Sequence, residues 1–89
     1  MAHKVDELLE AELNDAKSQL KVGGIYCHYK NPERYYKIIG FAVQEATEKI
    51  CVIYQAQYSK KFTFVRDLDS WLENPVISGK KVARFTLIQ

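Results

Sequence analysis

The sequence has few of the residues on which metal binding, disulfide bonding and catalysis usually depend. Its 89 residues include two cysteines, two histidines, two prolines and four glycines. Cys27 and Cys51 are far apart and form no CxxC pair, so neither a zinc finger nor a disulfide framework is indicated. His3 and His28 alone do not make a zinc site. We therefore expect no metal and no cofactor.

Other features of enzymes and membrane proteins are also missing. No apolar run approaches the roughly 20 residues of a membrane span, and no secretion leader is recognisable, so we expect a cytoplasmic protein with free thiols. Gly23-Gly24 fits neither glycine-rich phosphate-binding pattern. Cys27 and His28 are adjacent, so on a strand they point to opposite faces and cannot form a catalytic dyad. We expect a protein that is not an enzyme.

What is present is an ordinary globular mixture with an uneven charge distribution. Apolar residues make up 47% of the chain and charged residues 27%, which suits one small domain. The net charge is +2, but the first 20 residues carry −3 and the remainder carries +5. A basic body permits an anionic partner without requiring one.

Residues 1–21 are predicted to form an amphipathic helix. Apolar side chains follow the helical period between residues 4 and 21, and Gly23-Gly24 follows as a possible left-handed cap. A helix this short is barely stable alone, so its apolar stripe must dock on its own sheet or on another copy of the chain. We expect a homodimer or larger assembly through this stripe, which comprises Val5, Leu8, Leu9, Leu13, Ala16 and Leu20.

Residues 22–89 are predicted to form a mainly β domain, because alternating apolar patterns are separated by short polar turns. Gly40 suggests a bulge, and Asp67 can cap a helical turn over residues 68–73 that precedes the last strand. Short connections favour antiparallel pairing. We predict a small five-stranded antiparallel SH3-like barrel. Its strands are expected near residues 25–30, 35–43, 50–58, 62–66 and 82–88.

Two finer expectations concern the first two strands. Ile25, Cys27 and Tyr29 are assigned to the core face because they alternate with polar or amphipathic residues. Residues 31–34, which include Pro32, are assigned to the turn between the strands. This places Tyr26 and His28 on the face turned away from the core.

From Val22 to Ile88 the sequence resembles the bacterial and phage family called domain of unknown function 1653. The opening pattern Gly-x-Tyr-x-His-Tyr-Lys is met by residues 24–30, and further motifs follow in the family's order. Asp67 stands where the family usually has proline, and the N-terminal helix is not part of the usual domain. The resemblance implies a compact β-rich domain with no assigned activity. The further motifs are Tyr36–Ala42, Val52–Tyr58, Phe64–Leu68 with Trp71, Gly79-Lys80 and Arg84-Phe85.

Six tyrosines in or beside the predicted strands, with basic and amide residues nearby, suggest a surface for a planar anion. We predict that the domain binds a small anionic or nucleotide-like ligand, and that His28 and Arg66 line one cleft. The predicted ligand-binding residues are Tyr26, His28, Lys30, Tyr36, Gln55, Gln57, Arg66 and Trp71.

Plainer explanations stay open for each of these features. The tyrosines can be ordinary strand residues, and His28 can bond a neighbouring strand. Arg66 can form a salt bridge with Asp67, Asp69 or Glu73. Alternative functions are binding of single-stranded nucleic acid, helped by lysine pairs in the turns, and protein interaction or oligomerisation through the N-terminal helix.

Overall fold

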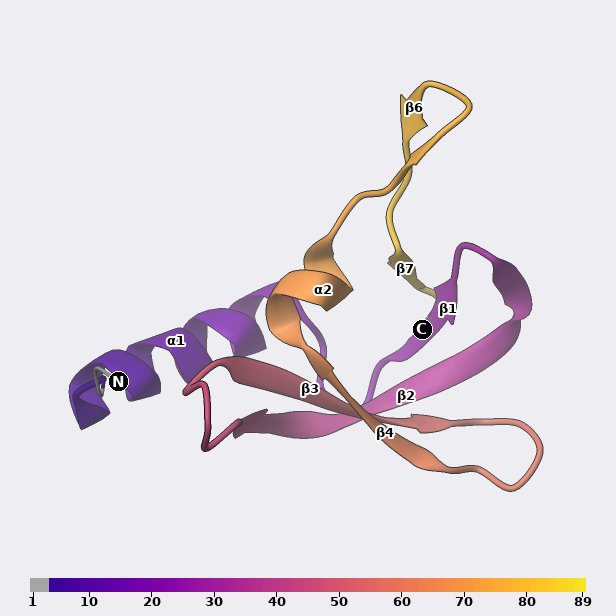
Figure 1. Ribbon diagram of the computed structural model, residues 1–89. Helices are drawn as coiled ribbons and strands as arrows, with labels where there is room; N and C mark the ends of the chain where they lie inside the picture. Colours follow the sequence, from indigo (N-terminus) through magenta and orange to yellow (C-terminus); the bar gives the residue numbers. More distant parts are fainter. Residues whose placement is uncertain (1–3) are drawn as a thin grey trace.

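The computed structural model describes residues 4–89 as one helix followed by a curved antiparallel sheet (Figure 1). The predicted mainly β class and N-terminal helix are confirmed, and helix α1 covers Asp6–Gln19. A short helix α2, Leu68–Leu72, lies where the helical turn was predicted. The strands are β1 Ile25–His28, β2 Asn31–Val43, β3 Ile50–Ala56, β4 Thr63–Asp67, β5 Val76–Ile77, β6 Lys80–Lys81 and β7 Phe85–Leu87.

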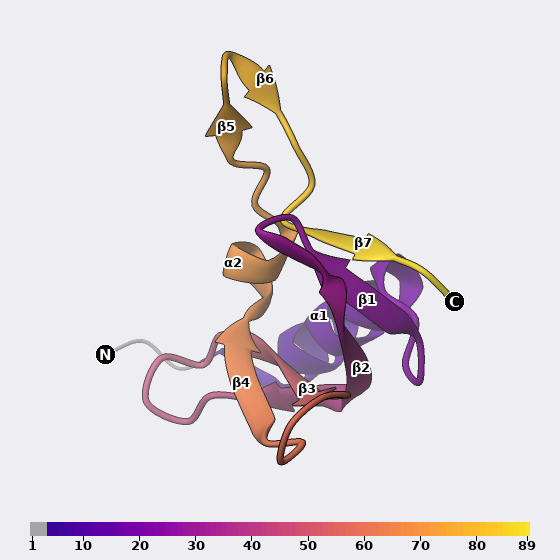
Figure 2. The same ribbon diagram turned by 90° about the vertical axis from the view of Figure 1, so that its right-hand side faces the viewer.

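Five strands form one sheet in the order β4-β3-β2-β1-β7, and every neighbouring pair is antiparallel. The outer strands β4 and β7 are not hydrogen-bonded to each other, so the sheet is open and the predicted closed barrel is not confirmed. The register of β2 against β3 shifts between Ile38 and Gly40, which is the bulge expected at Gly40. The sheet is strongly curved instead of closed, and its two edge strands, β4 and β7, lie on opposite sides of its concave face (Figure 2).

Two connections differ from the sequence-based expectation. The β1–β2 turn consists of Tyr29 and Lys30, so residues 31–34 belong to β2 and their assignment as the turn was wrong. The last predicted strand, residues 82–88, is shorter in the structure, where β7 covers only Phe85–Leu87. Residues 76–81 form the separate hairpin β5–β6, which projects from the body (Figures 1 and 2), while β7 pairs with β1. Ser78 and Gly79 both have positive φ, which suits a tight two-residue hairpin turn.

The core lies on the concave face of the sheet and is largely aromatic. β3 follows the predicted alternation, since Val52 and Tyr54 are both buried. β1 does not: Tyr26 belongs to the core cluster, so the assignment of Ile25, Cys27 and Tyr29 to the core face was wrong. Cys27 is also buried, on the other face. The core cluster consists of Leu20, Tyr26, Ile38, Val52, Tyr54, Trp71 and Phe85.

Helix α1 docks on its own sheet through its C-terminal half. Ala16 and Leu20 are buried, and the backbone N–H of Lys21 donates to the Tyr26 hydroxyl over 2.9 Å. Gly23 adopts φ +80°, but the helix ends at Gln19 and Leu20 is its C-cap residue. Gly23 therefore turns the chain toward β1 and does not cap the helix.

The predicted oligomerisation stripe is therefore divided along the helix. Ala16 and Leu20 are covered within the chain, and Leu9 and Leu13 are half-buried. Val5 and Leu8 remain 62% and 45% exposed. An apolar stripe covered by its own sheet no longer requires a second chain, so the stripe as a whole gives no reason to expect an oligomer.

Candidate functional site

The candidate site is centred on the ring of Phe85 in β7. Trp71 of α2 stacks on this ring, with centroids 3.7 Å apart and planes inclined by 5°. His28 of β1 meets the ring edge-on with centroids 5.0 Å apart, and the Arg66 guanidinium carbon lies 5.2 Å from the ring centroid. The Trp71–Phe85 stack is thus contacted by the imidazole of His28 from β1 and by the guanidinium of Arg66 from β4.

The curvature of the sheet explains how His28 and Arg66 come together. β1 and β4 are separated in the sheet by β2 and β3, yet both side chains lie against Phe85. α2 follows β4 directly and carries Trp71 back over the concave face. His28 and Arg66 therefore share one site, as their predicted placement in one cleft requires.

Arg66 is held by a neutral partner. Its Nη1 donates to the Ser70 hydroxyl over 3.2 Å. Within residues 4–89 no carboxylate forms an ion pair with it, so the alternative salt bridges to Asp67, Asp69 and Glu73 are not formed. The guanidinium keeps its full positive charge, and no protein carboxylate neutralises that charge in the described part of the chain.

A second arginine, which sequence reasoning missed, adds to the positive charge of the site. Arg84 precedes Phe85 and pairs with the exposed Glu73 at 3.4 Å, which is a long contact for a salt bridge. The Arg84 Nε is buried and has no hydrogen-bond partner. An unsatisfied buried donor costs free energy, and the Arg84 Nε carries this cost within the described residues.

The positive charges of the site affect the pKa of His28. Partial burial, followed by the charges of Arg66, Arg84 and Lys30, lowers the pKa of His28 from its ordinary value of 6.5. The backbone N–H of Lys30 donates to Nδ1 of His28 over 3.1 Å. The neutral imidazole therefore carries its proton on Nε2, which leaves Nε2 as a hydrogen-bond donor.

The pKa of His28 can be measured to test whether positive charge accumulates at this site. We expect an NMR titration of the imidazole C–H signals to give a pKa below 6.5, because burial and the three cations disfavour protonation. Since the unfolded chain takes up this proton first, His28 should lower the stability of the fold as the pH falls through 6.5 toward its folded pKa. Replacing Arg66 by alanine should move the pKa upward. A pKa at or above 6.5 in the intact protein would contradict this charge arrangement.

Three tyrosines extend the aromatic surface beside Phe85. The Tyr36 and Tyr58 hydroxyls are 2.7 Å apart, and Tyr36 meets Tyr54 edge-on at 5.6 Å. Burial, then the hydrogen bond to Tyr58, raises the pKa of Tyr36 to about 12. The Arg34 guanidinium lies 5.0 Å from the Tyr58 ring centroid. Tyr36 therefore remains neutral at physiological pH, and the surface combines aromatic rings with cationic groups.

The other predicted ligand-binding residues are placed less favourably. Tyr26 is buried in the core, where its hydroxyl accepts from Lys21. Gln55 alternates with Tyr54 and so points to the opposite face of β3. Gln57 donates to the Gln55 carbonyl. The structure thus brings together His28, Lys30, Tyr36, Arg66 and Trp71 from the predicted set. Tyr26 meets Trp71 edge-on at 5.4 Å but is buried, and Gln55 and Gln57 lie outside this group.

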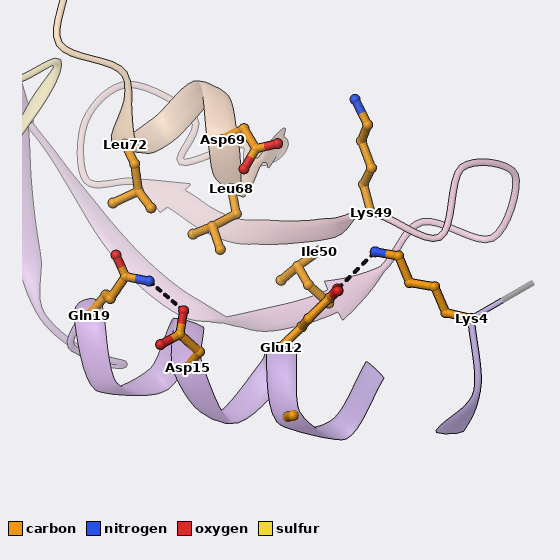
Figure 3. Close-up of a pocket in the computed structure, with 10 residues that line it drawn as sticks. Lys4, Glu12, Asp15, Gln19, Lys49, Ile50, Leu68, Asp69 and Leu72 are labelled. Carbon is orange, nitrogen blue, oxygen red and sulfur yellow. Dashed lines mark hydrogen bonds and ion pairs between the residues drawn. The ribbon is translucent and has the colours of Figure 1, made fainter. Parts of the chain in front are cut away.

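A cleft of about 490 Å³ lies elsewhere, between α1 and the side formed by α2 and the start of β3 (Figure 3). None of the predicted ligand-binding residues lines it. On its polar rim Lys4 pairs with Glu12 at 2.8 Å and Gln19 donates to Asp15. Its floor is apolar, with Ile50 and Leu68.

Metal and thiol chemistry find little support in the described residues. Between residues 4 and 89 no three acidic, histidine or cysteine side chains gather closely enough to hold a metal ion, and His3 lies outside that range. Cys51 is buried, and burial followed by its hydrogen bond to Asp67 raises its pKa, so its thiol stays protonated. No helix in the described chain is long and apolar enough to cross a membrane.

The family comparison covers the sheet and the site together. Residues 24–87 match the model for DUF1653, described as a protein of unknown function. The chain belongs to this family. The crystal structure of a DUF1653 protein from Bordetella bronchiseptica is similar with a TM-score of 0.65 and 26% identity, over 79% of this chain and 90% of that chain. No curated protein shows significant sequence similarity to this chain.

The DUF1653 region contains every residue placed around Phe85, whereas α1 lies before it. Two of the residues that the candidate-site prediction omitted, Arg84 and Phe85, form the closing Arg-Phe pair of the family motifs. This motif was the one feature of the sequence that could have pointed to Arg84 and Phe85 as site residues. Its role could not be assigned from sequence, because only the curvature of the sheet shows that Phe85 faces His28 and Arg66.

Proposed function

We propose that this DUF1653 domain is a non-catalytic binding module for a small planar anion such as a nucleotide. The observation that carries the proposal is the unneutralised positive charge against the Trp71–Phe85 stack. Arg66 has no carboxylate partner within residues 4–89, and Arg84 keeps an unpaired buried Nε. Guanidinium groups bind phosphate and carboxylate through paired hydrogen bonds.

The aromatic surface favours a planar anion over a cation. Rings alone can hold a cationic ligand through their π faces. Here, however, the rings are already accompanied by Arg34, Arg66 and Arg84, and the charges of Arg66 and Arg84 disfavour protonation of His28. A second cation would meet the same repulsion. An anion would relieve it, and a planar group attached to the anion could pack beside the tyrosine rings.

We propose binding in place of catalysis because the candidate nucleophiles are poorly arranged for it. Cys27 points away from its neighbour His28, and Cys51 is kept protonated by burial and by Asp67. We also propose that the domain acts in the cytoplasm, since both cysteines are free and buried, as is usual in a reducing compartment.

The test uses adenosine monophosphate as the planar anion and adenosine as its uncharged counterpart. Calorimetric titration should show binding of the monophosphate and much weaker binding of adenosine. Arg66→Ala should weaken monophosphate binding roughly ten- to one-hundredfold, because hydrogen bonds to charged groups contribute about 1.5–3 kcal/mol. Its melting temperature should fall by only a few degrees, since Arg66→Ala loses one neutral hydrogen bond, to Ser70, and one contact with the Phe85 ring.

Lys80→Ala, in the projecting β5–β6 hairpin, is the matched control and should leave monophosphate binding unchanged. If Arg66→Ala unfolds the domain while the monophosphate fails to bind the intact protein, Arg66 is structural. Native mass spectrometry of protein taken from cell extract would then show whether another small molecule is retained. Strong salt-dependent retention on single-stranded DNA, lost in Lys80→Ala, would favour the nucleic-acid alternative.

A further inference from the structure

Strand β4, Thr63–Asp67, leaves one side of its backbone unpaired at the edge of the sheet. The Ala56 N–H donates to the Phe62 carbonyl over 2.9 Å, which makes this pair a hydrogen-bonded one. Bonded and non-bonded pairs alternate along an antiparallel ladder. Phe64 and Arg66 therefore bond β3, and the N–H and C=O groups of residues 63, 65 and 67 point away from the sheet.

This edge lacks the features that usually prevent pairing with another chain. Proteins protect edge strands with proline, lysine, bulges or very short strands. β4 contains no proline or lysine, and its register against β3 is regular. Val65 and Phe62 are 64% and 62% exposed. The opposite edge, β7, is only three residues long, so β4 is the edge better suited to pairing.

We propose that β4 pairs antiparallel with β4 of a second copy of this chain, about a two-fold axis at Val65. The two sheets then join into one continuous sheet across the interface. Val65 meets its own counterpart, and Thr63 meets Asp67 of the partner subunit, so all three outward-facing residues form hydrogen-bonded pairs in both directions. The dimer does not depend on the proposed function.

Side-chain chemistry supports this self-pairing. The Thr63 hydroxyl can donate to the carboxylate of Asp67 of the partner subunit, and the two Val65 side chains make an apolar contact on one face. On the concave face, Phe64 lies opposite Arg66 of the partner subunit, which suits a cation–π contact. A register centred on Phe64 would oppose Lys61 to Asp67, but Lys61 has φ +54° and cannot continue the strand.

The same pairing would bring the two Phe85 sites onto one face of the joined sheet. Opposed residues in an antiparallel pair share a face, so the concave faces of both copies lie on the same side. Each Arg66 then gains the ring of Phe64 from the partner subunit beside it. A ring supplied by the second copy would enlarge the aromatic surface next to the guanidinium.

Sedimentation of the full chain tests the assembly. The intact protein should sediment as a species of twice 10.3 kDa at high micromolar concentration. Val65→Lys places like charges on the two-fold axis and should give the monomer, with an unchanged circular-dichroism spectrum because Val65 is exposed. Val76→Lys, at a valine of nearly equal exposure in the projecting hairpin, should remain dimeric. An intact protein that stays monomeric would overturn the proposal, as would dissociation only in Val76→Lys or in Leu8→Lys.

Cysteine cross-linking tests the register independently. Residues opposed in a hydrogen-bonded pair have Cα atoms about 5.5 Å apart, a separation that a disulfide can bridge. Oxidation of Val65→Cys with copper phenanthroline should therefore yield a covalent dimer in high yield. Val76→Cys should yield little, and the native thiols are buried and should not react. Equal cross-linking of both variants, or none at position 65, would refute pairing about Val65.

Discussion

Replacing Trp71 by alanine should destabilise the domain by about 3–5 kcal/mol, the range for losing a large buried aromatic side chain. Trp71 is 2% exposed, stacks on Phe85 at 3.7 Å, and meets Tyr54 edge-on at 5.1 Å. It also brings α2 onto the sheet. Because small domains have total stabilities of about 5–15 kcal/mol, much of the Trp71→Ala population should be unfolded at physiological temperature.

Urea denaturation followed by far-ultraviolet circular dichroism measures this loss. Trp71→Phe keeps a ring that can stack on Phe85 and should lose clearly less stability than Trp71→Ala. Leu72→Ala, at the more exposed neighbouring position, controls for changes in α2 itself. A loss below about 1 kcal/mol in Trp71→Ala would mean that α2 is not anchored through this ring.

Replacing Arg84 by methionine should separate binding from stability. Methionine fills a similar volume, removes the unpaired buried Nε, and leaves behind only the exposed Glu73. Replacing a buried charge by an apolar side chain is often neutral or stabilising. We expect the free energy of unfolding to stay constant or rise, while binding of adenosine monophosphate falls at least roughly tenfold, since a charge-assisted hydrogen bond is lost.

Urea denaturation and calorimetric titration on the same preparation decide this prediction. Arg34→Met is the matched control, because Arg34 is exposed and contacts the Tyr58 ring. It should change the monophosphate affinity less than Arg84→Met does. If Arg84→Met loses several kcal/mol, as happens when a buried ion pair is broken, then Arg84 serves the fold and the proposed anion site loses its main support.

The sequence predicted the elements with clear periodicity and failed where both faces of a strand are covered. The alternation in β3 identified Val52 and Tyr54 as core residues. In β1 both Tyr26 and Cys27 are buried although successive side chains of a strand point to opposite faces, so both faces of β1 are covered. Alternation of an aromatic with a cysteine cannot show which of them faces the main core.

Only part of the candidate site could be predicted from the sequence, for a related reason. His28, Arg66 and Trp71 were identified from residue type and from the family motifs, and they do converge. Gln55 was included because it is polar and close to the tyrosines in sequence, although the strand period turns it away from Tyr54. Arg84 was missed because its partner Glu73 and its place beside the stack depend on contacts distant in sequence.

The position of Trp71 also gives this domain a built-in optical reporter. It is the only tryptophan in the chain, so all indole emission arises from one ring enclosed at the edge of the candidate site. Its partner in stacking, Phe85, carries the His28 ring and the Arg66 guanidinium against its remaining surface. A molecule that displaces either group changes the surroundings of the emitter, so occupancy of the site can be followed by intrinsic fluorescence without attaching a label.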